Sequence, residues 1–144
     1  FGTAAVFGTG TDDAAINNYS ASLLIQYGRT RFILTGDAQS EAEEAMLDAH
    51  TDLACDVLKA GHHGSHNATS DDWLARLQPR LAVISCGRHN RFGHPAPSTL
   101  ARLDAHGVQT YRTDHQGAIT FVSDGRTVTA RPFLDSPPLG KKLV

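Results

Sequence analysis

The stretch Leu34-Thr35-Gly36-Asp37-Ala38, followed by Lys59-Ala60-Gly61-His62-His63-Gly64-Ser65, decides the fold of this chain. It predicts an aspartate just past one strand and a pair of histidines just past the next, with an amphipathic helix between them. In α/β folds, the residues that carry chemistry lie in loops at the carboxyl ends of the strands. Carboxylate and imidazole groups are ligands of catalytic Zn²⁺ or Mn²⁺. The two motifs therefore predict that metal-type ligands converge on one edge of a sheet.

The segments around these motifs alternate between strand and helix patterns. Two apolar, β-prone runs joined by Gly28-Arg29-Thr30 predict a β-hairpin. Apolar residues at helical spacing, and short continuous apolar runs, predict the other elements. The expected strands are 22–27, 31–35, 56–60, 81–85, 108–112, 118–123 and 127–131, and the expected helices are 39–50, 70–77 and 98–106. Strands interleaved with helices favour an α/β fold with right-handed crossovers.

The rest of the chain has weaker patterns. Residues 1–18 predict a short strand and a loop, 86–97 a long loop, and Asp114-His115-Gln116-Gly117 a turn. We assign 1–134 to the folded domain and expect 135–144, which contain Pro and Lys, to be a disordered tail. Helices of one crossover direction cover only one face of a sheet, so we expect the other face to be apolar and largely uncovered.

Length and charge limit the classes of protein to consider. With 144 residues, the chain is one domain or a piece of a larger one, and its first residue is Phe rather than Met. The net charge of −2 gives no overall basic footprint of a nucleic-acid binder, although an active site needs only local positive charge. No apolar run approaches the ~20 residues of a membrane-spanning helix, so we expect no membrane insertion by this chain itself.

Each candidate residue also has a simpler interpretation. Asp37 taken alone could be the N-cap of the following helix, and His62 and His63 could be polar loop residues between glycines. Their arrival on neighbouring strand ends favours a metal or catalytic role. In the loop Arg88-His89-Asn90-Arg91-Phe92-Gly93-His94-Pro95, arginine can bind phosphate in a bidentate manner and a histidine can act as acid, base or ligand. By itself this loop could simply be solvated.

Together, the motifs resemble the C-terminal half of the metallo-β-lactamase-fold domain of the competence DNA-uptake channel family, ComEC. The resemblance covers about residues 16–132. The order and spacing of five motifs make it specific. The similar segments are, in order, 17–20, 34–38, 56–65, 83–95 and 111–119.

The resemblance implies a four-layer αββα fold with a dinuclear metal site between two sheets. Asp37 takes the place of the family's metal-bridging aspartate, and His62 or His63 that of its last metal histidine. We favour His62 as the ligand because it follows the glycine directly. His94 is expected to take part in catalysis. Phosphate binding is expected from four further residues, namely Ser65, Arg88, Asn90 and Arg91.

The chain also departs from the family pattern. The family's His-x-His-x-Asp-His motif, which carries most ligands of both metals, belongs to the N-terminal half and is not present in this sequence. Where many relatives place another ligand histidine, before the hairpin, this chain has Asn17 and Asn18, a substitution that ComEC-like proteins share. We therefore expect only the C-terminal half of the αββα fold, one mixed sheet with helices on one face, and no activity in isolation.

The function implied for the full-length parent is metal-dependent hydrolysis of DNA phosphodiesters, with two Zn²⁺ or Mn²⁺ ions activating water. The parent would lie in the bacterial cytoplasmic membrane, with this domain soluble and outside the cytoplasm. DNA and the missing N-terminal half of the domain would be its partners. Two alternatives remain open. One is another hydrolase of the same fold, such as a phosphorylcholine esterase-like enzyme, and the other is a non-catalytic DNA-binding or structural module of the uptake machinery.

Overall fold

A six-stranded mixed sheet forms the centre of the molecule. The computed structural model describes residues 4–5, 13–49, 52–135 and 139. The strands lie in the order β1-β2-β3-β4-β5-β6, with β1, β2 and β3 antiparallel and β3 to β6 parallel. Their bounds are β1 Ala4–Ala5, β2 Ser22–Tyr27, β3 Thr30–Leu34, β4 Val57–Lys59, β5 Leu81–Ile84 and β6 Gln109–Arg112. The predicted hairpin and the predicted mixed sheet are confirmed.

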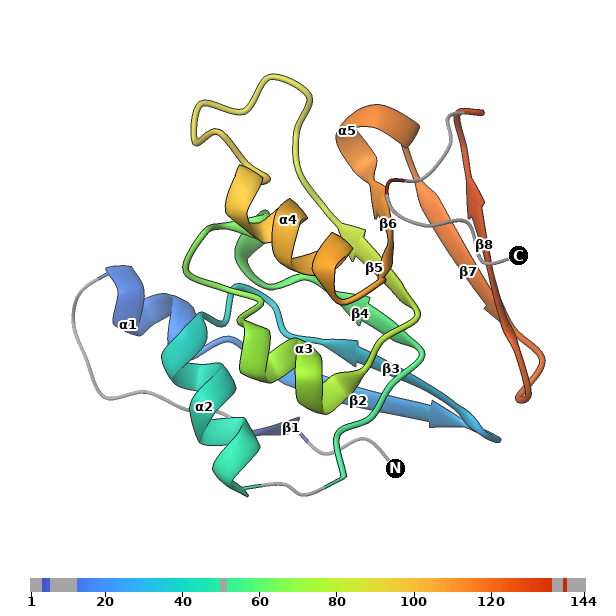
Figure 1. Cartoon of the computed structure of the whole chain (residues 1–144), viewed down its shortest axis with the longest axis horizontal. Coiled ribbons are helices and arrows are strands. Elements are labelled where there is room, and N and C mark those ends of the chain that lie inside the picture. The colour runs from blue at the N-terminus through green and yellow to red at the C-terminus, as the bar shows by residue number, and fades with distance from the viewer. Residues whose placement is uncertain (1–3, 6–12, 50–51, 136–138, 140–144) are drawn as a thin grey trace.

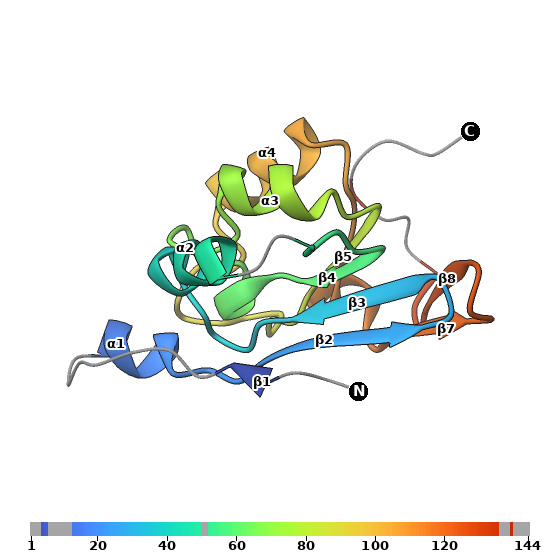
Figure 2. The same cartoon turned by 90° about the horizontal axis from the view of Figure 1, so that it is seen from below.

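Three helices cover one face of this sheet, as expected from the crossovers (Figure 2). They are α2 Ser40–Ala49, α3 Asp71–Leu77 and α4 Pro97–Ala105. The main core lies between them and the sheet, where Trp73 and Leu77 of α3 and Leu103 of α4 meet Leu58 and Ile84 of the strands. None of the helices within the described ranges has the length and apolar character needed to span a membrane.

The other face of the sheet is partly covered by the chain itself. A separate hairpin of β7 Ile119–Ser123 and β8 Val128–Pro132 lies beyond β6 (Figure 1). Phe121 and Val128 of this hairpin pack with Val57, Leu81 and Tyr111 in a second, smaller core. The expectation of an almost uncovered face is therefore wrong for this part of the sheet, because the closing strands fold back as a second layer.

Part of β2 on the same face remains exposed. Leu24 packs against the helix-side core, so the alternating residues Leu23 and Ile25 project from the opposite face. They are 38% and 45% exposed, respectively. Leu23 and Ile25 are thus exposed apolar side chains on this face that the smaller core does not include.

Two short helices lie where sequence patterns indicated irregular structure. Helix α1 spans Asp13–Asn18, within the segment expected to be a loop, and α5 spans Thr113–Gln116, where a turn was expected. The α5 turn closes through a hydrogen bond from the Gly117 amide to the Thr113 carbonyl, and the Gln116 side chain accepts one from the Arg112 amide. Such local bonds stabilise a single helical turn that has no apolar periodicity to reveal it.

The predicted tail, 135–144, lies mostly outside the described residues. Leu139 is described, and its backbone exchanges two hydrogen bonds with Thr110 at the edge of β6.

A buried carboxylate fixes the loop between the histidine pair and α3. Glu43 of α2 is fully buried and accepts hydrogen bonds from the backbone amides of Thr69 (2.5 Å) and Ser70 (2.9 Å). Arg102 of α4 donates from Nε to the Thr69 carbonyl and from Nη2 to that of Ala68. Burial raises the pKa of the Glu43 carboxyl, while the amide donors and Arg102 partly offset the increase. Two helices therefore hold this loop from both sides.

We expect Glu43→Ala to lower the free energy of unfolding by about 2–4 kcal/mol, because two buried amides would lose their acceptor. Glu44→Ala is the matched control, since Glu44 is exposed on the same helix, and its effect should stay within about 0.5 kcal/mol. Urea denaturation followed by circular dichroism measures both. Similar losses in the two variants would contradict the role assigned to Glu43.

Candidate functional site

The loops that follow three parallel strands meet at one edge of the sheet. Asp37 follows β3, the histidine pair follows β4, and His94 lies in the long loop between β5 and α4 (yellow in Figure 1). His63 Nε2 is 3.4 Å from Asp37 Oδ1. The ring of His62 lies 5.6 Å from that of His94 and 6.2 Å from that of His63, measured between centroids. The four residues predicted as the catalytic group are therefore neighbours, and we call them the edge cluster.

A tight left-handed turn presents both histidines to the same space. His62 and His63 have φ values of 43° and 56°, which side chains with a Cβ rarely adopt. Gly64 continues the turn with a φ of +79°, and a Cβ there would lie 2.8 Å from Cβ of Pro95. A Cβ on Gly61 would lie 2.6 Å from the Ala38 carbonyl oxygen. The glycines on both sides are thus required by close packing, and such backbone strain is typical of functional sites.

His63 is oriented as a ligand would be. Its Nδ1 lies 2.7 Å from the Ser85 carbonyl oxygen. A carbonyl only accepts, so the proton is on Nδ1. In the neutral ring, the Nε2 lone pair then faces the Asp37 carboxylate, and a cation between the two atoms would satisfy both. Metal-binding histidines characteristically donate their other ring nitrogen to a carbonyl in this way.

His62 has the opposite hydrogen-bonding pattern. Asn67 Nδ2 donates to Gln39 Oε1 (2.8 Å), so the Gln39 amide nitrogen lies against His62 Nδ1 at 3.2 Å. Nδ1 is therefore an acceptor, and the neutral ring carries its proton on Nε2. Adjacent histidines in the sequence thus present different groups to the site, a lone pair from His63 and a donor from His62.

Two residues that support the edge cluster were not predicted from the sequence. Lys59, the last residue of β4, donates from Nζ to the carbonyls of Gly36 (2.8 Å) and Ala60 (3.1 Å). Burial lowers the pKa of its amino group, and the nearby charge of Asp37 opposes this. Ser20 Oγ accepts a hydrogen bond from the Asp37 amide. A lysine at the end of an otherwise apolar strand was the available signal for Lys59, and the place of Ser20 in the similar segment 17–20 was the signal for Ser20.

The loop that carries His94 is held by Asn90. Its Nδ2 donates to the carbonyls of Gly87 (2.8 Å) and His94 (2.6 Å), and its Oδ1 accepts from the His94 amide (2.8 Å). Burial, and then the neighbouring His62 and His63, lower the pKa of the His94 imidazole. The Asn90 side chain is therefore engaged within its own loop.

The other residues predicted to bind phosphate have different surroundings. Arg88 Nε donates to the Asp114 carbonyl at 3.2 Å. Ser65 is 4% exposed, and its carbonyl accepts a hydrogen bond from Thr99 Oγ1. Arg91 is exposed at the loop tip, with its guanidinium carbon 5.1 Å from the centroid of the Phe92 ring. Phosphate binding by Ser65, Arg88, Asn90 and Arg91 stays a prediction.

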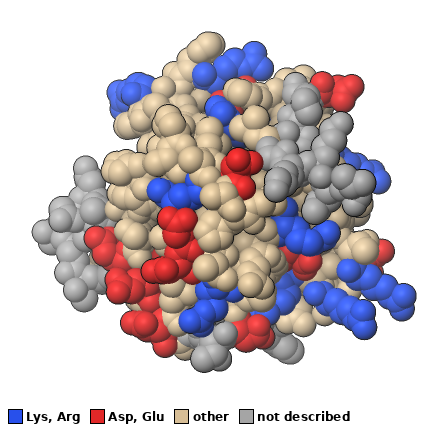
Figure 3. Space-filling view, viewed as in Figure 1, with Lys and Arg blue, Asp and Glu red and all other residues tan. Residues whose placement is uncertain are grey.

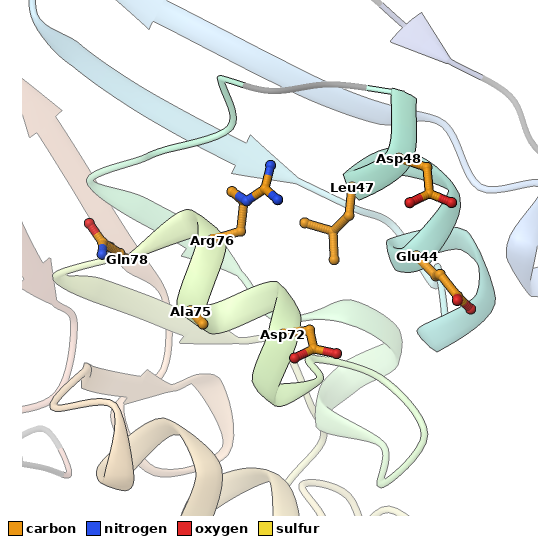
Figure 4. A pocket seen from close by; sticks show the side chains of 7 residues that line it. All are labelled: Glu44, Leu47, Asp48, Asp72, Ala75, Arg76 and Gln78. Atoms are coloured by element: carbon orange, nitrogen blue, oxygen red, sulfur yellow. The ribbon is translucent and has the colours of Figure 1, made fainter.

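The edge cluster is not a complete metal site. Within the described ranges, no three His, Cys, Asp or Glu side chains are grouped so that they could hold a metal ion. A surface hollow between α2 and α3 involves none of the edge cluster (Figure 4). It is lined by Glu44, Leu47, Asp48, Asp72, Ala75, Arg76 and Gln78. On the face seen in Figure 3, acidic side chains gather over α2 and basic ones are scattered.

The family model described as the metallo-beta-lactamase superfamily matches residues 14–89, just over half of the 144 residues. The chain belongs to the metallo-β-lactamase superfamily. The matched segment contains Asp37, His62 and His63 and ends before His94.

Competence proteins are among the relatives of this metallo-β-lactamase-fold chain, which confirms the ComEC resemblance. ComE operon protein 3 of Bacillus subtilis is 38% identical over 118 residues, which is 82% of this chain and 15% of that protein. Competence protein ComA of Neisseria gonorrhoeae is 35% identical over 106 residues, 73% of this chain and 15% of that protein. Recombination protein 2 of Haemophilus influenzae is 35% identical over 112 residues, 76% of this chain and 14% of that protein. The chain thus spans about 15% of the length of the curated relatives it matches.

We expect Asn90→Ala to loosen the loop of this metallo-β-lactamase-fold chain, because three hydrogen bonds that close it around His94 would be lost. Trypsin should then cleave after Arg91 several times faster than in the unmodified protein, as judged by mass spectrometry of timed samples. His89→Ala, at the exposed neighbouring position, is the control and should leave the cleavage rate unchanged. Equal rates in all three proteins would show that Asn90 does not order the loop.

Proposed function

We propose that this chain is the C-terminal part of a metal-dependent phosphodiester hydrolase domain in a DNA-uptake protein. The observation that carries the proposal is the Nε2 lone pair of His63 facing the Asp37 carboxylate at the carboxyl edge of a metallo-β-lactamase-fold sheet. The competence proteins among its relatives support the biological context.

The donor set suits Zn²⁺ or Mn²⁺, because it combines an imidazole nitrogen with a carboxylate oxygen. Asp37 and His63 would hold the metal, and His63 replaces His62 as our preferred ligand. The metal, when bound, supplies Lewis-acid activation of water and of the phosphate. Two donors are too few for a stable catalytic site, so the remaining ligands would come from the N-terminal half of the domain.

Other residues of the chain would act on the substrate or on the ligands. His62 would donate a hydrogen bond from Nε2 to a phosphate oxygen, because its Nδ1 is taken by Gln39. Arg91 would neutralise phosphate charge at the rim. Lys59 would hold the turn before Asp37 by binding the Gly36 carbonyl, which makes it a positioning residue.

The exposed part of β2 supports docking of the N-terminal half. Leu23 and Ile25 project from the face opposite the helices and are not part of the smaller core that β7 and β8 complete. A second sheet packed there would cover these side chains and bring further ligands to the edge cluster. We also propose that the assembled domain lies outside the cytoplasm, attached to a membrane channel, as the ComEC resemblance implies.

A non-catalytic DNA-binding or structural module is the second candidate function. It is favoured by the absence, among the described residues, of any group of three metal-type side chains. Supplying the N-terminal half distinguishes the two, because only an enzyme would gain hydrolytic activity from it. Screening the assembled domain against phosphocholine esters tests the phosphorylcholine esterase-like alternative.

Metal titration should identify the ligand histidine. The unmodified chain should bind Zn²⁺ or Mn²⁺ weakly and at one site, as measured by isothermal titration calorimetry. His63→Ala and Asp37→Ala should each abolish measurable binding, whereas His62→Ala should leave it nearly unchanged. Loss of binding in His62→Ala alone would return the ligand role to His62.

Hydrolysis of single-stranded DNA by the 144 residues alone should be undetectable in the presence of Mn²⁺ or Zn²⁺. It should appear when the N-terminal half of the domain is supplied, and Asp37→Ala should then reduce it by more than about 100-fold, because the proposed bridging ligand is removed. Gel analysis of a labelled oligonucleotide measures both steps. An assembled domain that binds metal and cleaves neither DNA nor phosphocholine esters would favour the non-catalytic module.

A further inference from the structure

Phe92 is a large aromatic side chain left in solvent beside the edge cluster. It is 68% exposed at the tip of the loop between β5 and α4. Its ring stacks on that of His94, with centroids 5.9 Å apart and planes inclined by 17°. The His94 ring in turn lies 5.6 Å from that of His62. A row of three rings therefore leads from the edge cluster to the surface.

The loop presents Phe92 in a defined position. Asn90 binds both the amide and the carbonyl of His94, so the residues between them form a closed turn. Gly93 has a φ of +70°, and a Cβ at that position would have open space around it. The ring is thus displayed by a constrained turn, and this preorganisation lowers the entropic cost of binding.

Arg91, the residue before Phe92, suits a polyanionic ligand. The guanidinium carbon of Arg91 is 5.1 Å from the Phe92 ring centroid. An arginine beside an exposed aromatic ring pairs a phosphate-binding group with a stacking surface, which is the combination that single-stranded nucleic acids require.

We propose that Phe92 and Arg91 form a nucleotide-binding site at the rim of the edge cluster. Phe92 stacks on the base of the nucleotide next to the phosphate at the cluster, and Arg91 contacts the neighbouring backbone phosphate. Stacking on an aromatic face tolerates any base and needs an unpaired one, so the site selects single strands with little sequence preference. This inference rests on the proposed function, whose phosphodiester substrate it narrows to single-stranded nucleic acid.

Binding measured without hydrolysis tests the site. Fluorescence anisotropy with EDTA present compares a labelled oligothymidylate with an abasic oligonucleotide of the same length, which has the phosphates and no bases. The unmodified chain should bind oligothymidylate about tenfold more tightly than the abasic strand. Phe92→Ala should reduce oligothymidylate binding to the abasic level and leave abasic binding unchanged. Phe133→Ala is the matched control, because Phe133 is 80% exposed and follows β8.

Tryptophan fluorescence in a Phe92→Trp variant reports directly on whether a base stacks at this position. The protein has one tryptophan, Trp73, which is 1% exposed, so the new emission of Phe92→Trp reports on the loop. Oligothymidylate should quench this emission and the abasic strand should not. Three results would each overturn the proposal. The unmodified chain could bind both strands equally tightly, Phe92→Ala could keep full affinity for oligothymidylate, or neither strand could bind detectably.

The stacking site and the proposed hydrolase function can be rejected independently of each other. Base-dependent binding without any hydrolysis by the assembled domain would retain the stacking site and reject the hydrolase. Hydrolysis with a KM for oligothymidylate that Phe92→Ala leaves unchanged would retain the hydrolase and reject the stacking site. The N-terminal half alone could also quench the Phe92→Trp emission, with no further response to oligothymidylate. Phe92 would then be an interface residue, and the proposal would be overturned.

Discussion

The parallel pairing of β3, β4 and β5 is the constraint on which the rest of the structure depends. Leu34, Lys59 and Val83 lie in register across these strands, so the three loops that follow begin at the same level. Cross-connections then link one loop to the next. The Gly36 carbonyl accepts from the His62 amide and from Lys59, and the Ser85 carbonyl accepts from His63. A shift of one residue in any pairing would separate these partners and turn alternate side chains to the wrong face.

Periodicity and turn chemistry in the sequence were sufficient to predict the sheet and the three helices on it. They also predicted that Asp37 and the histidine pair meet at a common edge, because strand order in such folds constrains where loops meet. The place of His94 in the same group was expected from the ComEC resemblance. The tautomers of His62 and His63 could not be predicted, since they depend on Gln39 and Ser85, which are distant in sequence. The packing of β7 and β8 on the second face was equally hidden, because alternation within a strand does not identify the sheet it joins.

Among the described residues other than glycine, four have a positive φ, and two of these, His62 and His63, lie at the proposed site. The strained turn at His62 and His63 is enclosed by Pro95, Ile84 and Ala38, which leave no room for other residues at Gly61 and Gly64. Glu43 and Arg102 hold the loop behind this turn through buried hydrogen bonds. The strain is therefore opposed by tertiary contacts from helices α2 and α4, strand β5 and two neighbouring loops rather than by local sequence preference.

The facing atoms of His63 and Asp37 come from loops that follow different strands, Asp37 after β3 and His63 after β4. A divalent ion held by both atoms would therefore cross-link two neighbouring loops. Because such an ion binds only where folding has brought the two loops together, its binding free energy would add to the stability of the folded chain. The ion would then fasten the edge of the sheet whether or not it also takes part in chemistry.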